Sequence, residues 1–371
     1  MAKTLFDKVN MGTVALANRV AMAPLTRNRA PDGVPTAMMA TYYQQRATAG
    51  LLISEGTSIT QEGQGYSDVP GLYTAQQVQG WKQVTAAVHQ AGGRIVTQLW
   101  HVGRVSHTAL QKDGQAPVAP SAIQAKSRVY VINADGTGGF LETSMPRALL
   151  AEELPRVCDD YRHAMKAAVE AGFDGVEIHA ANGYLLDQFL RSGANHRTDA
   201  YGGSVENRAR FPLEVVAATI EAAAGHPVGI RISPAAPANG LEDPNPQEVF
   251  DYFVAQLAKF PLAFVHVIEG ATGGPRDYQM GGKSFDYVQL KAAYTKAGGK
   301  GLWMVNNGYD RASAQKAVES GYADMVSFGR AYIANPDLVR RLHDGSPLNT
   351  PDQTTFYGGG EKGYIDYPAL P

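Results

Sequence analysis

The sequence predicts an α/β fold in which parallel strands and helices alternate and close into a (β/α)8 TIM barrel. Short apolar runs recur along the chain, and they are continuous rather than alternating, which is typical of strands buried on both faces. Segments with helical spacing separate most of these runs. Alternating strands and helices with short connections form βαβ units, and about eight such units close a barrel. An open doubly wound sheet is the structural alternative.

The eight expected strands are apolar runs rich in β-branched residues, at 19–23, 51–55, 94–99, 175–179, 228–232, 264–268, 302–306 and 324–328. Helical spacing predicts helices over residues 75–91, 152–171, 207–224, 247–259, 284–297 and 311–320. The first three of these helices end at Gly92, Gly172 and Gly225, and glycine is the residue type favoured just after a helix.

The largest irregular stretch is residues 101–146, between the third and fourth expected strands. Within it, residues 128–132 followed by the turn-rich residues 133–139 have the pattern of a β-hairpin. A βα insertion of this size lies at the active face of a barrel, so we expect a lid. Extra residues before the first strand, with a turn at Gly12, are expected to form a hairpin that plugs the opposite end. No linker is evident, so residues 1–371 are expected to form a single domain.

Composition narrows the classes of function. The chain has 33 basic and 35 acidic side chains, which gives no reason to expect nucleic acid or an anionic membrane as a partner. The amino terminus lacks the apolar core of a signal peptide, and no run approaches the ~20 apolar residues of a membrane span. The single cysteine, Cys158, is expected to be a structural thiol. We expect a cytoplasmic monomer or homodimer that acts on a small molecule.

Polar residues collect where the expected strands end, which is where barrel enzymes place their chemistry. Several such positions on one rim indicate a large polar ligand. They are Thr26, Gly56, Thr57, Gln98, Trp100, His179, Arg231, Asn306, Asn307, Gly308, Gly329 and Arg330.

The last two strand ends suggest a phosphate site. Backbone N–H groups of Asn307–Gly308 and Gly329–Arg330, with the Arg330 guanidinium, would form a cradle for phosphate. The alternative is that the glycines only turn the chain and Arg330 forms a surface ion pair. Arg231 is a second cation at the mouth, and it needs an anionic ligand or a partner such as Glu177.

Two other strand-end side chains suit a ring ligand. Gln98 offers both a donor and an acceptor, as the imide edge of a flavin requires. Thr26 would donate to a ring carbonyl, although a hydroxyl at this position is also an ordinary cap or turn residue.

The segment after the fourth expected strand holds the candidate catalytic residues. His179 and Asn182 are three residues apart, so one turn of helix would place both side chains on one face. Both would donate to one oxygen of a bound carbonyl or nitro group and stabilise the developing enolate. Tyr184 would supply a proton. A lone histidine at a strand end is otherwise an ordinary core residue.

Other chemistries find little support. The histidines lack the paired spacing of a hydrolytic zinc site, so no metal is expected. Lysine is absent from the strand ends, which disfavours a Schiff-base aldolase. The G-x-G-x-x-G pattern at residues 358–363 follows no expected strand and is not taken as a dinucleotide site.

Over nearly its whole length the chain resembles the Old Yellow Enzyme family of FMN-dependent ene-reductases. The segment at residues 179–190 (HAANGYLLDQFL) is highly specific for that family. The other matching segments are residues 23–27, 98–104, 195–208, 329–338 and 356–360.

The resemblance implies non-covalent FMN held by Pro24, Thr26, Gly56, Gln98, Arg231, Asn307, Gly308, Gly329 and Arg330. His179 and Asn182 would bind the activating oxygen, and Tyr184 would be the proton donor. Tyr66, Trp100 and Tyr357 would line the substrate pocket together with His179 and Asn182.

The implied activity is ping-pong hydride transfer from NAD(P)H, through flavin N5, to activated C=C bonds. The substrate classes would be α,β-unsaturated ketones, aldehydes, imides and nitroalkenes. Two alternatives stay open. One is a phosphate-sugar isomerase or aldolase without flavin, for which Glu177 and Glu269 are the candidate bases. The other is a non-catalytic flavin carrier.

Overall fold

The computed structural model describes residues 3–132 and 135–371, and its centre is a closed barrel of parallel strands. Parallel pairing of β14 with β3, in which Val326 lies opposite Val20, closes the barrel. The predicted (β/α)8 barrel is therefore confirmed, and the open sheet is wrong. In chain order the strands are β3 (Val20–Met22), β4 (Leu51–Ser58), β5 (Ile95–Trp100), β10 (Val176–Ala180), β11 (Val228–Ile232), β12 (Phe264–Ile268), β13 (Leu302–Asn306) and β14 (Met325–Phe328).

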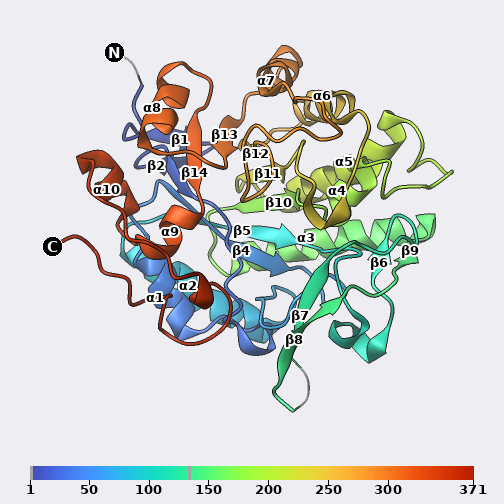
Figure 1. The fold of residues 1–371 in the computed structure, drawn as a ribbon, viewed down its shortest axis with the longest axis horizontal. Coiled ribbons are helices and arrows are strands. Elements are labelled where there is room, and N and C mark those ends of the chain that lie inside the picture. The colour runs from blue at the N-terminus through green and yellow to red at the C-terminus, as the bar shows by residue number, and fades with distance from the viewer. Residues whose placement is uncertain (1–2, 133–134) are drawn as a thin grey trace.

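Helices surround this barrel (Figure 1). The six predicted helices are present as α2 (Ala75–Gln90), α3 (Leu154–Glu170), α5 (Val205–Ala222), α6 (Pro246–Leu257), α7 (Tyr287–Lys296) and α8 (Arg311–Glu319). Local signals set their ends: Thr74 and Gln77 form a capping box at the start of α2, and Gly92 follows it at φ +80°. Four short helices lie outside the predicted set, namely α1 (Ala37–Gln44), α4 (Leu185–Leu190), α9 (Arg330–Ala334) and α10 (Leu338–Asp344).

The amino-terminal end of the barrel is closed by a hairpin, as the sequence predicts. Strands β1 (Val9–Met11) and β2 (Val14–Leu16) pair antiparallel, and Gly12 turns the chain at φ +58°. Met11 and Leu16 are buried in one apolar cluster with Phe264 and Met304 of the barrel strands. Because apolar side chains fill this end of the barrel, the polar side chains lie at the opposite end, where the strands have their carboxyl termini.

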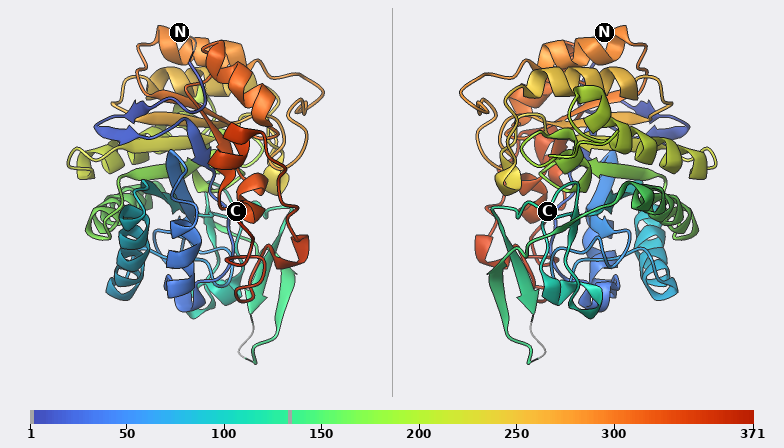
Figure 2. Two further views of the ribbon diagram at one scale, coloured as in Figure 1. Left: turned by 90° about the vertical axis from the view of Figure 1, so that its left-hand side faces the viewer. Right: turned by 90° about the vertical axis from the view of Figure 1, so that its right-hand side faces the viewer.

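The insertion after β5 carries two small strand pairs. Strands β6 (Val118–Ala119) and β9 (Arg147–Ala148) pair in parallel, and β7 (Arg128–Ile132) pairs antiparallel with β8 (Gly138–Glu142). The predicted turn residues Asn133 and Ala134 lie outside the described residues. The β7–β8 hairpin and the amino-terminal hairpin lie on opposite sides of the molecule (Figures 1 and 2). Within the described ranges, no helix has the length and apolar character needed to span a bilayer.

Candidate active site

A chain of buried polar side chains crosses the barrel from four strands. Gln98 Nε2 on β5 donates to Glu177 Oε1 on β10 at 2.8 Å. Glu177 Oε2 lies 2.7 Å from His266 Nδ1 on β12, and His266 Nε2 lies 2.7 Å from Ser327 Oγ on β14. All four side chains are at most 2% exposed. Burial of this many polar groups is tolerated because each of them is hydrogen-bonded.

Arg231 lies beside this chain, on β11. Its Nη2 donates to Asn306 Oδ1 at 2.8 Å, so its bonded partner is Asn306 rather than the Glu177 partner considered from the sequence. Its buried Nε has no partner among the described residues. Burial lowers the pKa of Arg231 to about 10, and the charge of Glu177 opposes that shift. The guanidinium therefore stays charged at neutral pH and keeps a free donor.

The expectation that one helical turn carries His179 and Asn182 is wrong. His179 belongs to strand β10, and Asn182 lies in the turn before α4 at φ +58°, followed by Gly183 at φ +74°. Asparagine adopts this left-handed conformation more readily than most residues. The turn is fixed because the backbone N–H of Asn182 donates to Ser233 Oγ at 2.7 Å.

Both side chains nevertheless offer donors. Asn182 Oδ1 accepts from Thr272 Oγ1 at 2.7 Å, which leaves the amide nitrogen of Asn182 to donate. Nδ1 of His179 is buried without a partner in the described part of the chain. Burial, the charge of Arg231 and His266 together hold the pKa of His179 well below its usual value, so its imidazole is neutral at neutral pH.

A cluster of three aromatic side chains lies beside His179. The rings of His179 and Tyr184 are 5.0 Å apart, and Trp100 lies edge-to-face with Tyr184 at 5.0 Å and stacked with Tyr66 at 5.7 Å. The phenols of Tyr66 and Tyr184 are 3.3 Å apart. Burial, reinforced by Tyr66, raises the pKa of Tyr184 well above its ordinary value, so its phenol keeps its proton.

The loop around Tyr357 is fixed by two arginines next to Thr26. Arg27 Nη2 donates to the Gly363 carbonyl at 2.7 Å, and Arg29 Nε donates to the Gly360 carbonyl at 3.1 Å. The glycine-rich 358–363 pattern therefore forms a loop bound to the end of β3. Tyr357 itself is 65% exposed, and its phenol adds to the rise in the pKa of Tyr66 that burial causes. Tyr357 thus lies at the open side of the aromatic cluster.

Pro24 and Thr26 are half-buried in the segment that follows β3, and the next strand fixes this segment. Glu55 Oε2 on β4 accepts from the Arg27 backbone N–H at 3.2 Å, and the Glu55 backbone N–H donates to the Tyr43 hydroxyl at 2.9 Å. Gly56 follows Glu55, and a Cβ at Gly56 would lie 2.5 Å from the Trp100 ring. Glycine is needed at this position because the indole approaches the backbone so closely.

The predicted phosphate residues lie together at the ends of β13 and β14. Asn307 has φ +92° and Gly308 has φ +65°, and such consecutive left-handed residues favour an anion-binding concavity of backbone N–H groups. The Asn307 side chain points elsewhere, because its Nδ2 donates to the Glu269 carbonyl at 2.7 Å. Gly329 precedes α9, and Arg330 Nη2 donates to the Gly273 carbonyl at 2.6 Å, which joins the loop after β12 to this region.

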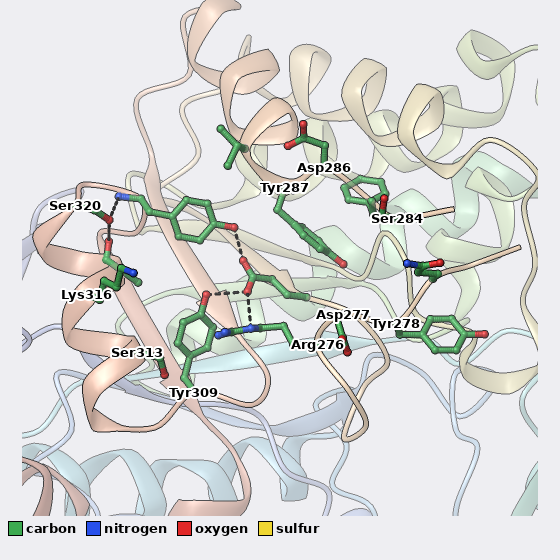
Figure 3. Close-up of a pocket in the computed structure, with 16 residues that line it drawn as sticks. Arg276, Asp277, Tyr278, Ser284, Asp286, Tyr287, Tyr309, Ser313, Lys316 and Ser320 are labelled. Carbon is green, nitrogen blue, oxygen red and sulfur yellow. Dashed lines mark hydrogen bonds and ion pairs between the residues drawn. The ribbon is translucent and has the colours of Figure 1, made fainter. Parts of the chain in front are cut away.

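A separate hollow of about 780 Å³ lies between the loop after β12 and α8 (Figure 3). At its centre, Glu269 Oε2 accepts from the Tyr309 hydroxyl at 2.7 Å and lies 3.9 Å from Arg276 Nε. Its other oxygen accepts a short hydrogen bond from the Tyr322 hydroxyl. Both oxygens are therefore engaged. Glu269 is not poised as a base for an isomerase or aldolase, and neither is Glu177, whose oxygens bond Gln98 and His266.

The hydrogen-bond donors at the barrel mouth match the acceptor groups of FMN. Three buried nitrogens, Arg231 Nε, His179 Nδ1 and Trp100 Nε1, have no partner among the described residues. Leaving such groups unpaired is costly unless a ligand supplies acceptors. A flavin would offer a ring carbonyl to Arg231 Nε, and its phosphate suits the backbone turn at Asn307–Gly308. The nitrogens of His179 and Trp100 would remain for a substrate beside the ring.

Residue-level reasoning missed most of the polar chain beneath the mouth. The sequence predicts no role for His266 or Ser327, and it suggests Glu177 only as a partner for Arg231 or as a candidate base. A signal was present, because each of these polar residues interrupts an otherwise apolar strand segment. A buried polar side chain in such a run needs a partner on a neighbouring strand.

Comparisons with known proteins support the resemblance. The family described as "NADH:flavin oxidoreductase / NADH oxidase family" matches residues 4–349. The chain is 44% identical to 12-oxophytodienoate reductase 1 of Oryza sativa subsp. japonica, over 99% of this chain and 93% of that protein.

Two solved structures show the same architecture. The structure of morphinone reductase in complex with tetrahydroNAD is similar with a TM-score of 0.92 and 48% identity, over 100% of this chain and 98% of the other. The Old Yellow Enzyme homologue from Zymomonas mobilis has a TM-score of 0.92 and 42% identity, over 99% and 100% of the two chains. The chain therefore belongs to the NADH:flavin oxidoreductase / NADH oxidase family and is an FMN-dependent oxidoreductase that takes hydride from a reduced nicotinamide.

Proposed function

We propose that this chain reduces the C=C bond of α,β-unsaturated ketones, aldehydes, imides and nitroalkenes with NAD(P)H. One observation carries the proposal: a neutral histidine with a free buried nitrogen lies 5.0 Å, ring to ring, from a protonated tyrosine at the barrel mouth. An alkene conjugated to a carbonyl or nitro group needs such a pair, a donor for its oxygen and a proton for its α-carbon.

In this proposal, FMN held by the mouth residues would supply the hydride chemistry that links NAD(P)H to the β-carbon. His179 and Asn182 would donate hydrogen bonds to the substrate oxygen. Because neither side chain is charged, they would orient the substrate while Tyr184 supplies the proton. The Tyr184 phenol gives its proton to the α-carbon. Its raised pKa keeps that proton available at neutral pH, and the Tyr66 hydroxyl at 3.3 Å can return one.

The other mouth residues would bind the cofactor and line the pocket. Gln98 and Arg231 would meet the polar edge of the ring, with Pro24, Thr26 and Gly56 beside it. Asn307, Gly308, Gly329 and Arg330 would hold the phosphate. Tyr66, Trp100 and Tyr357 would form the walls of the substrate pocket, since the first two stack at 5.7 Å next to Tyr184.

The insertion would be the lid of a single FMN-binding domain that spans residues 1–371, with the lid at about 101–146. Its supporting contact is apolar: Val129 and Val131 of β7 pack in one cluster with Trp100, Tyr66 and Tyr184. A roof of this kind would exclude water from the reaction. The near-balanced charge of the chain fits a small-molecule substrate better than nucleic acid. A cytoplasmic monomer or homodimer stays a prediction.

The test is an absorbance spectrum of the purified protein, followed by anaerobic addition of NAD(P)H and then of 2-cyclohexenone. The proposal predicts a yellow protein that bleaches with NAD(P)H and regains its colour with the enone. A colourless protein that takes up no added FMN would overturn it. A yellow protein that NAD(P)H does not bleach would favour the flavin carrier.

A further inference from the structure

The buried chain Gln98–Glu177–His266–Ser327 extends below the proposed flavin site, and three of its members have no role in the reaction described above. It consists only of side chains, and it crosses the barrel interior from β5 to β14 with successive contacts of 2.8, 2.7 and 2.7 Å. The opposite end of the barrel is filled with apolar side chains such as Phe264 and Met304. A continuous polar chain in place of such packing calls for a reason beyond stability.

The donors and acceptors of this chain follow from its chemistry. Gln98 Nε2 can only donate, so Glu177 Oε1 accepts. Burial lowers the pKa of His266 despite the nearby carboxylate, so its imidazole is neutral and carries one proton. With that proton on Nδ1, His266 donates to Glu177 Oε2, and the Ser327 hydroxyl donates to Nε2. In this arrangement Glu177 accepts at both oxygens, as a carboxylate does.

Arg231 brings the opposite charge to the same layer. It lies opposite His266 in the β11–β12 register, and Glu177 is the charged group that raises its pKa against the effect of burial. One buried negative and one buried positive charge therefore lie under the mouth. Because they are in a region of low dielectric, each strongly affects any third charge that forms above them.

Resting on the proposed function, we infer that Glu177 is a positioning residue with two separable effects on the cofactor. Its hydrogen bond to Gln98 Nε2 turns the carboxamide oxygen away from Glu177, so that this oxygen is free to accept from the ring. Its negative charge offsets that of Arg231, and so it holds the flavin midpoint potential lower than Arg231 alone would set it.

Two conservative variants of the holoenzyme separate these effects. Glu177→Gln removes the charge but keeps both contacts. The carboxamide oxygen of the new glutamine accepts from Gln98, and its nitrogen donates to His266 Nδ1. For this, the imidazole proton moves to Nε2, where it faces Ser327. We expect FMN affinity within about threefold of the unsubstituted protein and a more positive midpoint potential. Glu177→Asp keeps the charge but is too short for the Gln98 contact. We expect FMN to bind about tenfold more weakly, with a smaller change in potential.

Glu319→Gln, on the exposed face of α8, is the matched control and should change neither quantity. If Glu177→Gln leaves the midpoint potential unchanged, or if both Glu177 variants weaken FMN equally without a difference in potential, the inference is overturned. An unsubstituted protein that binds no FMN would instead refute the proposed function itself. If the unsubstituted protein binds FMN and reduces enones, but Glu177→Gln has the same midpoint potential, only this inference is refuted.

A measurement on the unsubstituted protein decides the matter if neither variant folds. The ¹⁵N chemical shifts of the His266 ring report which nitrogen carries the proton. A neutral ring with its proton on Nδ1 is the expected result. A proton on Nε2 alone would make Nδ1 an acceptor, so Glu177 would have to be protonated and uncharged, which would overturn the inference.

Discussion

Two groups of buried polar side chains lie near the carboxyl ends of the barrel strands, and they differ in what they leave unbonded. In the hollow beside α8, both oxygens of Glu269 are engaged by Tyr309, Tyr322 and Arg276. At the mouth, Arg231 Nε and His179 Nδ1 are buried without a partner in the described ranges. Each unpaired group costs roughly 1–3 kcal/mol. The mouth therefore keeps buried donors for a ligand, whereas the carboxylate in the hollow beside α8 is already engaged by protein side chains.

The largest effect should come from the tyrosine at the mouth. Tyr184→Phe removes the proton donor and should slow alkene reduction by about 10²- to 10⁴-fold, the usual contribution of a general acid. Flavin reduction by NAD(P)H should change by less than about threefold, because that step needs no proton from Tyr184. Stopped-flow absorbance measures the two half-reactions separately. Equal losses in both would show that Tyr184 supports the pocket and is not the proton donor.

The second largest loss of activity should follow substitution of His179, whose buried Nδ1 has no partner among the described residues. His179→Ala should lower kcat/KM for enones by about 10²- to 10³-fold, as loss of an oxyanion donor does. Enone binding to the unsubstituted protein should vary little between pH 6 and 8, since the pKa of His179 lies well below its usual value and Asn182 does not titrate. Equilibrium titration with an enone across this pH range tests the prediction. A binding change that follows a protonation near pH 6.5 would contradict the neutral imidazole.

A third carboxylate, that of Glu62, differs from Glu269 because charged partners lower its pKa. Glu62, in the segment after β4, lies 2.9 Å from Nη2 of Arg156 on α3 and 3.5 Å from the buried His101 Nε2 at the start of the insertion. These groups outweigh burial and lower the pKa of Glu62 to about 2, from an ordinary 4.5. Its folded-state pKa lies below its unfolded value, so its contribution is full above about pH 4.5 and is lost as pH falls toward 2.

Glu62→Gln should therefore cost roughly 2–3 kcal/mol of unfolding free energy at pH 7 and almost nothing below pH 2. Urea unfolding of both proteins across this pH range measures the difference. A cost that does not shrink in acid would mean that the loss is one of packing and not of charge.

The smallest effect belongs to the bonded carboxylate. Glu269→Gln should leave kcat/KM within about twofold and change stability by less than about 1 kcal/mol at pH 7. Burial already raises the pKa of Glu269, so the folded state gains little from its charge, and the amide retains an acceptor for one of the two phenols. Steady-state kinetics and thermal unfolding, with Tyr309→Phe alongside, provide the check. A large loss of activity would place chemistry in the hollow beside α8.

The sequence predicts the barrel well because its evidence is local. Each buried strand is a short apolar run, and α2 begins at its own capping box. The short helices escape prediction because tertiary contacts fix them. For example, Arg191, the residue that follows α4, donates to Asp187 of that helix and to the Ser233 carbonyl. Residues of distant strands have to be assembled before such a contact exists.

The same distinction between local signals and tertiary contacts applies to the site. Gln98, His179 and Arg231 can be found from the sequence because a polar residue at a strand end reveals its position. The left-handed turn at Asn182 cannot, since it depends on Ser233, which is 51 residues away in the sequence. The hydrogen-bond partners cannot be read from the sequence either. The sequence suggests Glu177 as the partner of Arg231, whereas in the folded barrel Glu177 bonds Gln98 and Arg231 bonds Asn306.

The most direct test is a titration of FMN into the apoprotein, compared between Arg231→Met and Glu269→Gln. The unsubstituted chain should bind one FMN. Arg231→Met, which removes a donor and a charge from the mouth, should weaken binding by at least about tenfold, whereas Glu269→Gln should bind like the unsubstituted chain. If Glu269→Gln weakens FMN and Arg231→Met does not, the flavin site is not where the unpaired donors lie.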